Sequence, residues 1–241
     1  MDVGGPIVRG CTVCGRFVLM TPGKGLAERF ELEETPELAP RYNIAPTQLI
    51  AIVRADTSGG RRCLDFVKWG LIPAWSKDPS IGNKMINARA ETAAEKPAFR
   101  SAFKHRRCLV PADGFYEWKK TKDGRRRPFL AARADGAVFA FAGLWETWTG
   151  PEGRVVQSGT VLTTDANELM ASIHDRMPVI LDPEHYGPWL DPGFRDQDLL
   201  THLLRPYPSN AMTLKPVGLK VNKASYDAPD CVEDYIEAPD E

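Results

Sequence analysis

Residues 107–148 read RCLVPADGFYEWKKTKDGRRRPFLAARADGAVFAFAGLWETW and contain three apolar, β-rich runs. The runs cover residues 107–118, 128–133 and 137–148. The pairs Asp123-Gly124 and Asp135-Gly136 lie between them. Because Asp-Gly pairs between strand-like runs are strong hairpin signals, this stretch predicts a β-meander with antiparallel pairing.

Further strands and helices are predicted on both sides of the meander. The strands are expected at residues 49–54, 64–71 and 155–164. The helices are expected at residues 23–33, 88–94, 98–105, 165–173 and within 182–204, with Asp165 as an N-cap. Residues 36–46 predict irregular structure. The chain shows no internal repeat and no low-complexity linker, so we expect one α+β domain around a largely antiparallel sheet with peripheral helices.

The composition is that of an ordinary globular protein, with 241 residues of which 43% are apolar and 26% charged. No run approaches the ~18 consecutive apolar residues of a membrane span. The net charge of −1 does not by itself indicate a polyanion partner. However, residues 119–127 hold six bases and one acid, residues 104–107 are a second basic cluster, and residues 226–241 hold seven acids. A near-neutral sum can therefore conceal a basic face, although each cluster alone is also typical of a solvated turn.

The five cysteines at positions 11, 14, 63, 108 and 231 are an odd and scattered set. They predict no disulfide framework, which fits a reducing cytosol. Cys11 and Cys14 have C-x-x-C spacing. A redox or zinc site would need a second ligand pair or a βαβ context, and neither is recognisable in the sequence.

Cys14 is the strongest candidate for chemistry. A cysteine at a mature N-terminus carries an amine and a thiol on adjacent carbons. The amine captures an aldehyde as a Schiff base, and the thiol closes it into a five-membered thiazolidine. An internal cysteine lacks this reaction because its nitrogen is an amide.

Residues 1–13 show neither a helical nor a strand period, and they lack the basic and apolar regions of a signal peptide. Valine is what a GUG start codon encodes when it is read as an internal codon. We therefore expect residues 1–13 to be an extension absent from the mature protein, with synthesis starting at Val13 and methionine removal exposing Cys14. Cleavage of a leader is a second route. On Cys14 alone, an ordinary buried cysteine behind a retained extension stays open.

Two segments place polar side chains within apolar surroundings. Asn87 and Arg89 follow an apolar pair, where they either begin a helix or line a pocket for an anion or a sugar hydroxyl. Glu117 lies between aromatic residues. Buried there, its pKa would rise into the range useful for general acid–base catalysis; facing outward, it would pair with Lys119 or an arginine.

His174 follows a predicted helix and precedes a turn containing proline. Histidine is the usual proton shuttle near neutral pH, although a lone histidine is more often structural. Asp175 or Arg176 could orient its ring or bind phosphate.

Trp69 and Trp75 flank a Gly–Pro loop, and Asn43 lies in a similar polar-aromatic loop at residues 42–46. Exposed aromatics beside arginines can stack on unpaired bases, which contributes ~1–3 kcal/mol per base. The alternative is core packing, which we expect for one of the two tryptophans. The motifs of P-loop hydrolases, dinucleotide-binding folds, zinc peptidases and serine hydrolases are absent from the sequence.

These segments together resemble the SRAP family of abasic-site-processing proteins. The matching motifs run in family order over residues 14–222. They are CGRF at 14–17, YNIAP at 42–46, WGLIP at 69–73, INARAET at 86–92, GFYEW at 114–118 and IHDRMP at 173–178.

The resemblance implies an α+β, barrel-like SRAP domain at residues 14–225, followed by an acidic tail at 226–241. It implies a monomer of the bacterial cytoplasm, associated with the nucleoid when DNA is damaged in the SOS response. The partner would be single-stranded DNA containing abasic sites, crosslinked through Cys14 without cofactor or metal. Lyase activity, self-reversal and peptidase self-processing are implied as well.

The resemblance also implies roles for individual side chains. Those resembling catalytic residues are Cys14, Asn87, Glu117 and His174. Those expected at DNA are Arg16, Asn43, Trp69, Trp75, Arg89, Thr163 and Arg176. A thiol autopeptidase with Cys14 as nucleophile and His174 as base is an alternative, as is a non-catalytic module that binds single-stranded DNA.

Overall fold

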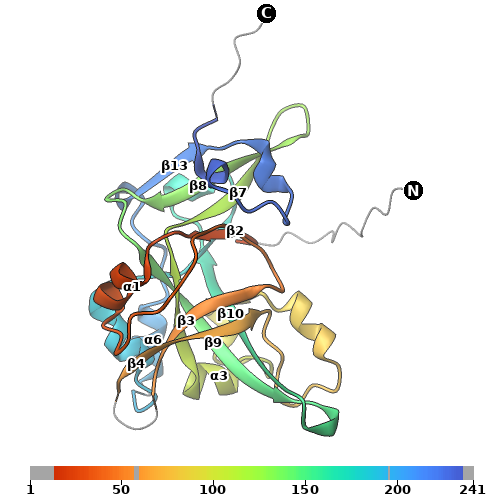
Figure 1. Ribbon diagram of the computed structural model, residues 1–241, viewed down its shortest axis with the longest axis vertical. Coiled ribbons are helices and arrows are strands. Elements are labelled where there is room, and N and C mark those ends of the chain that lie inside the picture. Colours follow the sequence, from red (N-terminus) through yellow and green to blue (C-terminus); the bar gives the residue numbers. More distant parts are fainter. Residues whose placement is uncertain (1–13, 57–59, 195, 236–241) are drawn as a thin grey trace, which may run out of the picture.

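The computed structural model describes residues 14–56, 60–194 and 196–235. Within these residues, five strands form a closed barrel (Figure 1). The strands are β3 (Leu49–Ala55), β4 (Arg62–Trp69), β6 (Arg107–Ala112), β9 (Phe139–Thr149) and β10 (Val155–Asp165). Each pairs with the next in the order β10-β4-β3-β6-β9, and β9 pairs with β10 to close the ring. The β10–β4 pairing is parallel and the other pairings of the ring are antiparallel.

A second, five-stranded antiparallel sheet lies beside the barrel. Its strands, in spatial order, are β13 (Met212–Pro216), β8 (Arg126–Arg133), β7 (Gly114–Lys120), β1 (Phe17–Leu19) and β2 (Arg41–Ile44). The chain passes from β6 in the barrel to β7 in this sheet at Asp113. The Asp113 carboxylate accepts hydrogen bonds from the backbone nitrogens of Met20 and Thr21, which fixes the chain after β1 beside the crossing point.

An aromatic cluster joins the two sheets. The ring of Phe141 on β9 lies 5.8 Å from Phe17 on β1, 6.0 Å from Phe115 on β7 and 5.4 Å from Phe139. All four rings are fully buried, and edge-to-face pairs of this kind contribute about 0.5–1.5 kcal/mol beyond the area that they bury. This packing holds β1 and β7 in fixed positions over the barrel.

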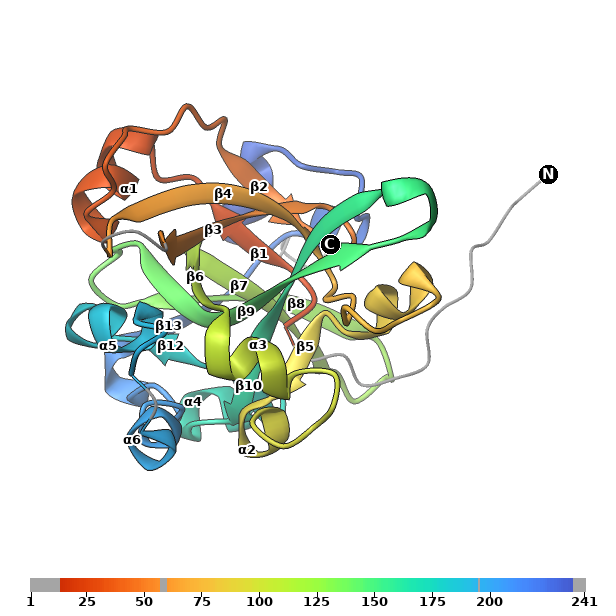
Figure 2. The same ribbon diagram turned by 90° about the horizontal axis from the view of Figure 1, so that it is seen from below.

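Short strands and helices surround the barrel; Figure 2 shows α2, α4, α5 and α6 towards its outside and α3 in front of the strands. The short strands are β5 (Asn87–Arg89), β11 (Arg176–Pro178) and β12 (Ile180–Leu181). The helices are α1 (Gly23–Phe30), α2 (Ala90–Ala93), α3 (Arg100–His105), α4 (Glu168–Ala171), α5 (Tyr186–Leu190) and α6 (Gln197–His202). Over the described residues, none of these helices is long and apolar enough to span a bilayer.

The structure confirms the predicted α+β class and the largely antiparallel, barrel-like sheet with peripheral helices. Several details were wrong. Residues 107–118 form two strands in different sheets, because Asp113 redirects the chain between them. Residues 36–46 were expected to be irregular but contain strand β2, whose polar residues make hydrogen bonds described below. The N-cap of α4 is Asn167 rather than Asp165, since the Asn167 side chain accepts from the Met170 nitrogen at 2.9 Å.

Candidate functional site

Cys14 and Glu117 are in direct contact. The Cys14 backbone nitrogen donates to Glu117 Oε1 at 2.6 Å. The strand register explains this contact. Phe17 on β1 pairs with Phe115 on β7, and because the two strands are antiparallel, the residues before Phe17 lie beside those after Phe115. Cys14 is fully buried and has a φ of 45°, in the left-handed region that non-glycine residues seldom adopt. The fold therefore turns the Cys14 nitrogen towards a single buried carboxyl group.

Burial raises the pKa of the Glu117 carboxyl from its ordinary value of 4.5 to about 7. Hydrogen bonds from the Cys14 and Trp118 backbone nitrogens act in the opposite direction, and the charge of Asp175 adds to the increase. Near neutral pH this carboxyl group exists in both protonation states, which suits a group that accepts and returns a proton. Of the two orientations that the sequence left open for Glu117, the buried one is correct, with 3% of the residue exposed.

The Cys14 thiol lies in the same buried environment. Burial, and then the negative charge of Glu117, raise its pKa well above the ordinary value for cysteine. A thiol peptidase needs a thiolate, which is normally produced by neighbouring cations or a helix N-terminus. The surroundings of Cys14 favour the neutral thiol instead, so they do not support the peptidase alternative.

The raised pKa of Glu117 predicts a pH dependence of stability. The folded state favours the neutral carboxyl, so the stability due to Glu117 is full below about 4.5 and is lost as the pH rises through about 7. Glu117→Gln keeps the shape of the side chain and removes this titration. We expect the free energy of unfolding of the variant to exceed that of the parent more at pH 8 than at pH 5, measured by urea denaturation. An equal difference at the two pH values would contradict the assignment.

Strand β10 carries the next group of predicted site residues. β5 pairs with it in parallel, so that Asn87 lies opposite Val161 and Arg89 opposite Thr163. Asn87 is partly buried, Arg89 is exposed, and Thr163 is buried with its hydroxyl 3.5 Å from the Ala88 carbonyl oxygen. The pairing thus gathers an amide, a guanidinium and a hydroxyl at the same end of β10.

His174 and Arg176 lie where the chain turns from α4 into β11. His174 Nδ1 lies 2.8 Å from Asp175 Oδ1 and accepts from the Arg176 backbone nitrogen at 3.1 Å. The Arg176 guanidinium binds both carboxylate oxygens of Glu91, at 2.7 and 2.9 Å, and also contacts Asp165. Because Arg176 is engaged with two carboxylates and only 13% of its side chain is exposed, it ties together elements of the fold. We do not assign it to DNA.

The two tryptophans differ in burial, in agreement with the expectation that one of them packs in the core. Trp69 is fully buried, donates from Nε1 to the Ile86 carbonyl oxygen at 2.8 Å and packs edge-on against Phe17 at 5.2 Å. A stacking role for Trp69 does not fit this position. Trp75 is 61% exposed and is available as a stacking surface.

Asn43 is not placed as an open contact residue, whereas Arg16 beside it is partly buried. Asn43 is fully buried, and its Oδ1 accepts from Arg16 Nη1 at 2.9 Å. Arg16 lies 5.8 Å from the centre of the Trp118 ring. Sequence reasoning did not single out Trp118, although it adjoins Glu117 in the sequence. Over the described residues, no group of three or more His, Cys, Asp or Glu side chains is arranged to hold a metal ion.

Comparison with known proteins gives a consistent picture. The family model described as "SOS response associated peptidase (SRAP)" matches residues 13–224. Abasic site processing protein YoqW of Bacillus subtilis is 43% identical over 226 residues, covering 92% of this chain and 100% of that protein. Abasic site processing protein YedK of Escherichia coli is 35% identical over 185 residues, covering 74% and 79%. Abasic site processing protein HMCES of Xenopus tropicalis is 31% identical over 232 residues, covering 84% and 68%.

Solved structures share the fold. A protein from Bacteroides thetaiotaomicron superposes with a TM-score of 0.82 at 25% identity, covering 92% of this chain and 100% of that chain. A protein from Bordetella bronchiseptica gives 0.74 at 28% identity, covering 86% and 100%.

Proposed function

Since the chain belongs to the SRAP family, we propose that it processes abasic sites in DNA by bonding covalently to them through an N-terminal Cys14. Relatives named abasic site processing proteins support the substrate class. The observation that carries the chemistry is the 2.6 Å contact between the Cys14 nitrogen and Glu117 Oε1. The proposal requires a working protein that begins at Cys14, because the nitrogen is an unreactive amide when residue 13 precedes it.

The reaction follows from the two groups of Cys14. An abasic deoxyribose opens to an aldehyde. An α-amine with an ordinary pKa of ~7.7–8.0 is partly neutral near pH 7 and attacks the carbonyl carbon. The carbinolamine loses water to give an imine, for which Glu117 supplies and removes protons. The thiol sulfur then adds to the imine carbon, its proton passes to the nitrogen, and a thiazolidine results.

The same intermediate provides the other activities that the family resemblance implied. Loss of a proton beside the imine permits β-elimination of the DNA strand, which is a lyase reaction. Protonation of the thiazolidine by Glu117 breaks the carbon–sulfur bond and restores the imine, and addition of water to the imine then returns the aldehyde and releases the amine of Cys14. Peptidase activity in this scheme is confined to removing whatever precedes Cys14, which produces the required amine.

The remaining polar residues are assigned to holding the sugar and the single strand. Asn87, Thr163 and His174 would contact the sugar or assist proton transfer, and Arg16 and Arg89 would contact phosphates. These assignments are supported by position. Asn87, Arg89 and Thr163 lie at one end of β10. His174 is next to Asp175, whose charge raises the pKa of Glu117. The protein would act on single-stranded DNA as a monomer.

One assay tests the proposed function. Protein beginning at Cys14 is incubated with single-stranded DNA carrying one abasic site, and the products are separated on a denaturing gel. A shifted band that survives denaturation supports the proposal. Binding that disappears on denaturation would indicate a non-catalytic module, and cleavage of a peptide in trans without DNA would indicate a peptidase. The matched control is the chain with residues 1–13 retained, for which we expect no stable adduct.

The tryptophans provide a separate prediction. Trp69→Ala is expected to lower the free energy of unfolding by about 3–5 kcal/mol, because it empties a packed site in the core. Trp75→Ala should leave stability within about 0.5 kcal/mol but weaken binding of undamaged single-stranded DNA by about 1–3 kcal/mol. Chemical denaturation and fluorescence anisotropy measure the two effects. Unchanged DNA affinity in the Trp75 variant would remove that residue from the binding surface.

A further inference from the structure

The segment after β13 folds back over the second sheet, and we call residues 217–235 the C-terminal strap (Figure 1). Val217 forms a bridge with Asp234, and the Tyr235 nitrogen donates to the Pro216 carbonyl oxygen. Val217, Val221 and Cys231 are fully buried in a small cluster with residues of β1, β7 and β8. Residues 226–235, which the sequence assigned to an acidic tail following the domain, thus pack on the domain.

Asn43 on β2 binds the strap through its side-chain amide. Its Nδ2 lies within hydrogen-bond distance of the carbonyl oxygens of Val221 (3.2 Å), Lys223 (3.1 Å) and Tyr226 (2.6 Å). Because Asn43 is fully buried, loss of this group would remove a buried donor from all three carbonyl oxygens, although that of Val221 also accepts from Arg16 and that of Lys223 from the Tyr226 backbone nitrogen.

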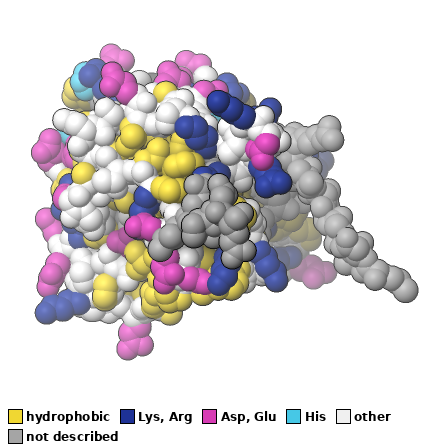
Figure 3. Space-filling model, turned by 90° about the horizontal axis from the view of Figure 1, so that it is seen from above, with side chains coloured by type: hydrophobic (Ala, Val, Ile, Leu, Met, Phe, Trp, Pro, Cys, Tyr) yellow, Lys and Arg dark blue, Asp and Glu magenta, His cyan; other side chains and the backbone are white. Residues whose placement is uncertain are grey.

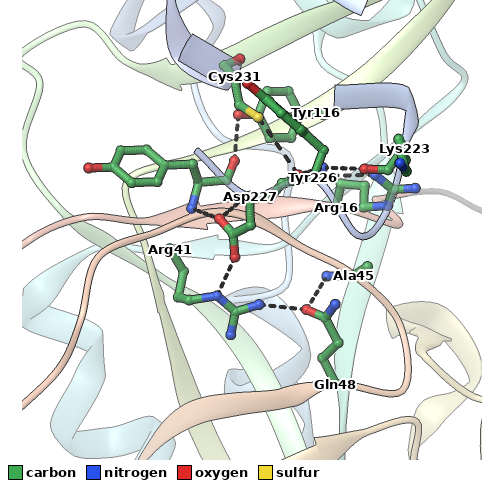
Figure 4. Close-up of polar contacts among 11 residues, drawn as sticks. Arg16, Arg41, Ala45, Gln48, Tyr116, Lys223, Tyr226, Asp227 and Cys231 are labelled. Carbon is green, nitrogen blue, oxygen red and sulfur yellow. Dashed lines mark hydrogen bonds and ion pairs between the residues drawn. The ribbon is translucent and has the colours of Figure 1, made fainter. Parts of the chain in front are cut away.

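Asp227 secures the strap from its own side (Figure 4). Its Oδ1 accepts from the backbone nitrogens of Tyr42 at 2.6 Å and Asn43 at 3.0 Å. Its Oδ2 pairs with Arg41 Nε, and the same arginine donates to Gln48 Oε1 at 2.7 Å. One carboxylate thus holds the strap to the edge strand of the sheet by two hydrogen bonds and an ion pair.

The strap and Asn43 together hold Arg16, two residues from Cys14. Arg16 Nη1 donates to Asn43 Oδ1 at 2.9 Å and to the Val221 carbonyl oxygen at 2.7 Å, and Nη2 lies 3.5 Å from the Asn222 carbonyl oxygen. The Arg16 guanidinium lies over the Trp118 ring, and Trp118 donates from Nε1 to Asn222 Oδ1 at 2.7 Å. These partners are all neutral, so the described residues fix the direction of the Arg16 guanidinium without cancelling its charge.

The distribution of charge over the surface bears on how a DNA strand could be bound. Seen from above in Figure 3, hydrophobic side chains gather near the centre of the face, with acidic and basic side chains interspersed around them. A face of mixed sign does not attract a DNA strand by a broad positive field. A planar guanidinium held in a fixed direction is well suited to binding an individual phosphate without such a field.

We propose that Asn43 and Asp227 are positioning residues, which lock the C-terminal strap so that Arg16 presents its charge to a DNA phosphate beside Cys14. This inference rests on the proposed action on DNA. Asn43, which the family resemblance implied as a DNA-contacting residue, would then act on DNA indirectly, through Arg16. It also makes the strap a wall of the binding site.

The test begins with the affinity of the full chain for undamaged single-stranded DNA, so that it does not depend on crosslinking. Asp227→Asn is expected to weaken binding about tenfold, the loss of one charge-assisted hydrogen bond. The slope of log K against log salt should become shallower by ~0.7, for one phosphate contact on a single strand. Asn43→Asp, which places a carboxylate beside Arg16, should have at least the same effect.

A double-mutant cycle separates positioning from general damage. In the Arg16→Gln background, Asp227→Asn should weaken binding no further, because the contact that it supports is already lost. The matched control is Asp135→Asn, since Asp135 also pairs with an arginine and accepts a backbone hydrogen bond, at 2.6 and 3.0 Å. This control should bind DNA with the parent's affinity and salt slope.

The outcomes distinguish the two proposals. A lowered melting temperature with unchanged affinity and salt slope, or additive losses in the cycle, would overturn the role of the strap. In protein beginning at Cys14, the Asp227 variant should show an unchanged adduct rate at saturating abasic DNA and require more DNA to reach it. If the parent forms no adduct but the affinity effects appear, the crosslinking proposal fails and the positioning role stands.

Discussion

Cys14→Ala, made in protein that begins at residue 14, is expected to abolish the adduct that survives denaturation. The variant keeps an α-amine, so it still forms a Schiff base, but that bond hydrolyses when the protein unfolds. The thiol of the parent closes the ring within one residue, and such intramolecular reactions reach effective concentrations of ~10⁵ M or more. The yield of stable adduct, measured on a denaturing gel, should fall by at least ~10²-fold.

The control for this prediction is Cys108→Ala. Cys108 on β6 is as deeply buried as Cys14, so its replacement matches the loss of a buried sulfur without touching the site. It should form the adduct at the parent's rate. A Cys14→Ala protein that still gives a full yield of stable adduct would mean that a lysine or another group bonds to the DNA.

Glu117→Gln should slow adduct formation by about 10²-fold or more, the usual contribution of a positioned acid–base group. The glutamine can still accept the hydrogen bond from the Cys14 nitrogen, so the geometry persists while proton transfer is lost. In protein that begins at Cys14, an α-amine would replace the amide at the 2.6 Å contact with Glu117, so we expect the two groups to titrate as a coupled pair. The pH profile of the parent should therefore reflect two groups and that of the variant only the amine.

Glu146→Gln is the matched control for Glu117. Glu146 on β9 is also a buried strand glutamate, at 6% exposure, but it pairs with Arg106 at 2.6 Å. Its replacement should change stability and leave the rate of adduct formation within about twofold of the parent. Single-turnover kinetics on abasic DNA across pH 5–9 measure both variants. Parent-like rates and an unaltered profile for Glu117→Gln would remove Glu117 from proton transfer.

The fold class could be predicted because the hairpin signals are local. The Asp-Gly pair at 123–124 joins β7 and β8 in a hairpin, as expected. The pair at 135–136 turns the chain from β8 into β9, which lie in different sheets and do not pair with each other, so the predicted meander is wrong at that point. No comparable local signal marks Asp113, where the chain passes from β6 to β7. This crossing depends on hydrogen bonds to Met20 and Thr21, about ninety residues earlier in the chain, so the sequence suggested one strand where the structure has two.

The direction in which each side chain faces was harder to predict. Strand alternation left Glu117 free to face solvent, whereas in the structure its carboxyl is buried and accepts a hydrogen bond from Cys14, more than one hundred residues earlier in the chain. Trp69 and Trp75 have similar sequence surroundings, yet only the first has the core beneath it. The residues of the site were named from family motifs, whereas the hydrogen bonds that orient Arg16 come from strand β2 and the segment after β13, which no local pattern connects.

The contact between Arg16 and Val221 spans 205 residues of sequence. Contacts of such separation form late in folding, because a long loop must close before they contribute. During synthesis, Cys14 leaves the ribosome long before Val221 and Asp227 exist. A nascent chain can therefore have its amino end trimmed while it still lacks the wall that orients Arg16. On the proposed route, an amine exposed at Cys14 during synthesis would therefore exist before the segment that orients Arg16 had been translated.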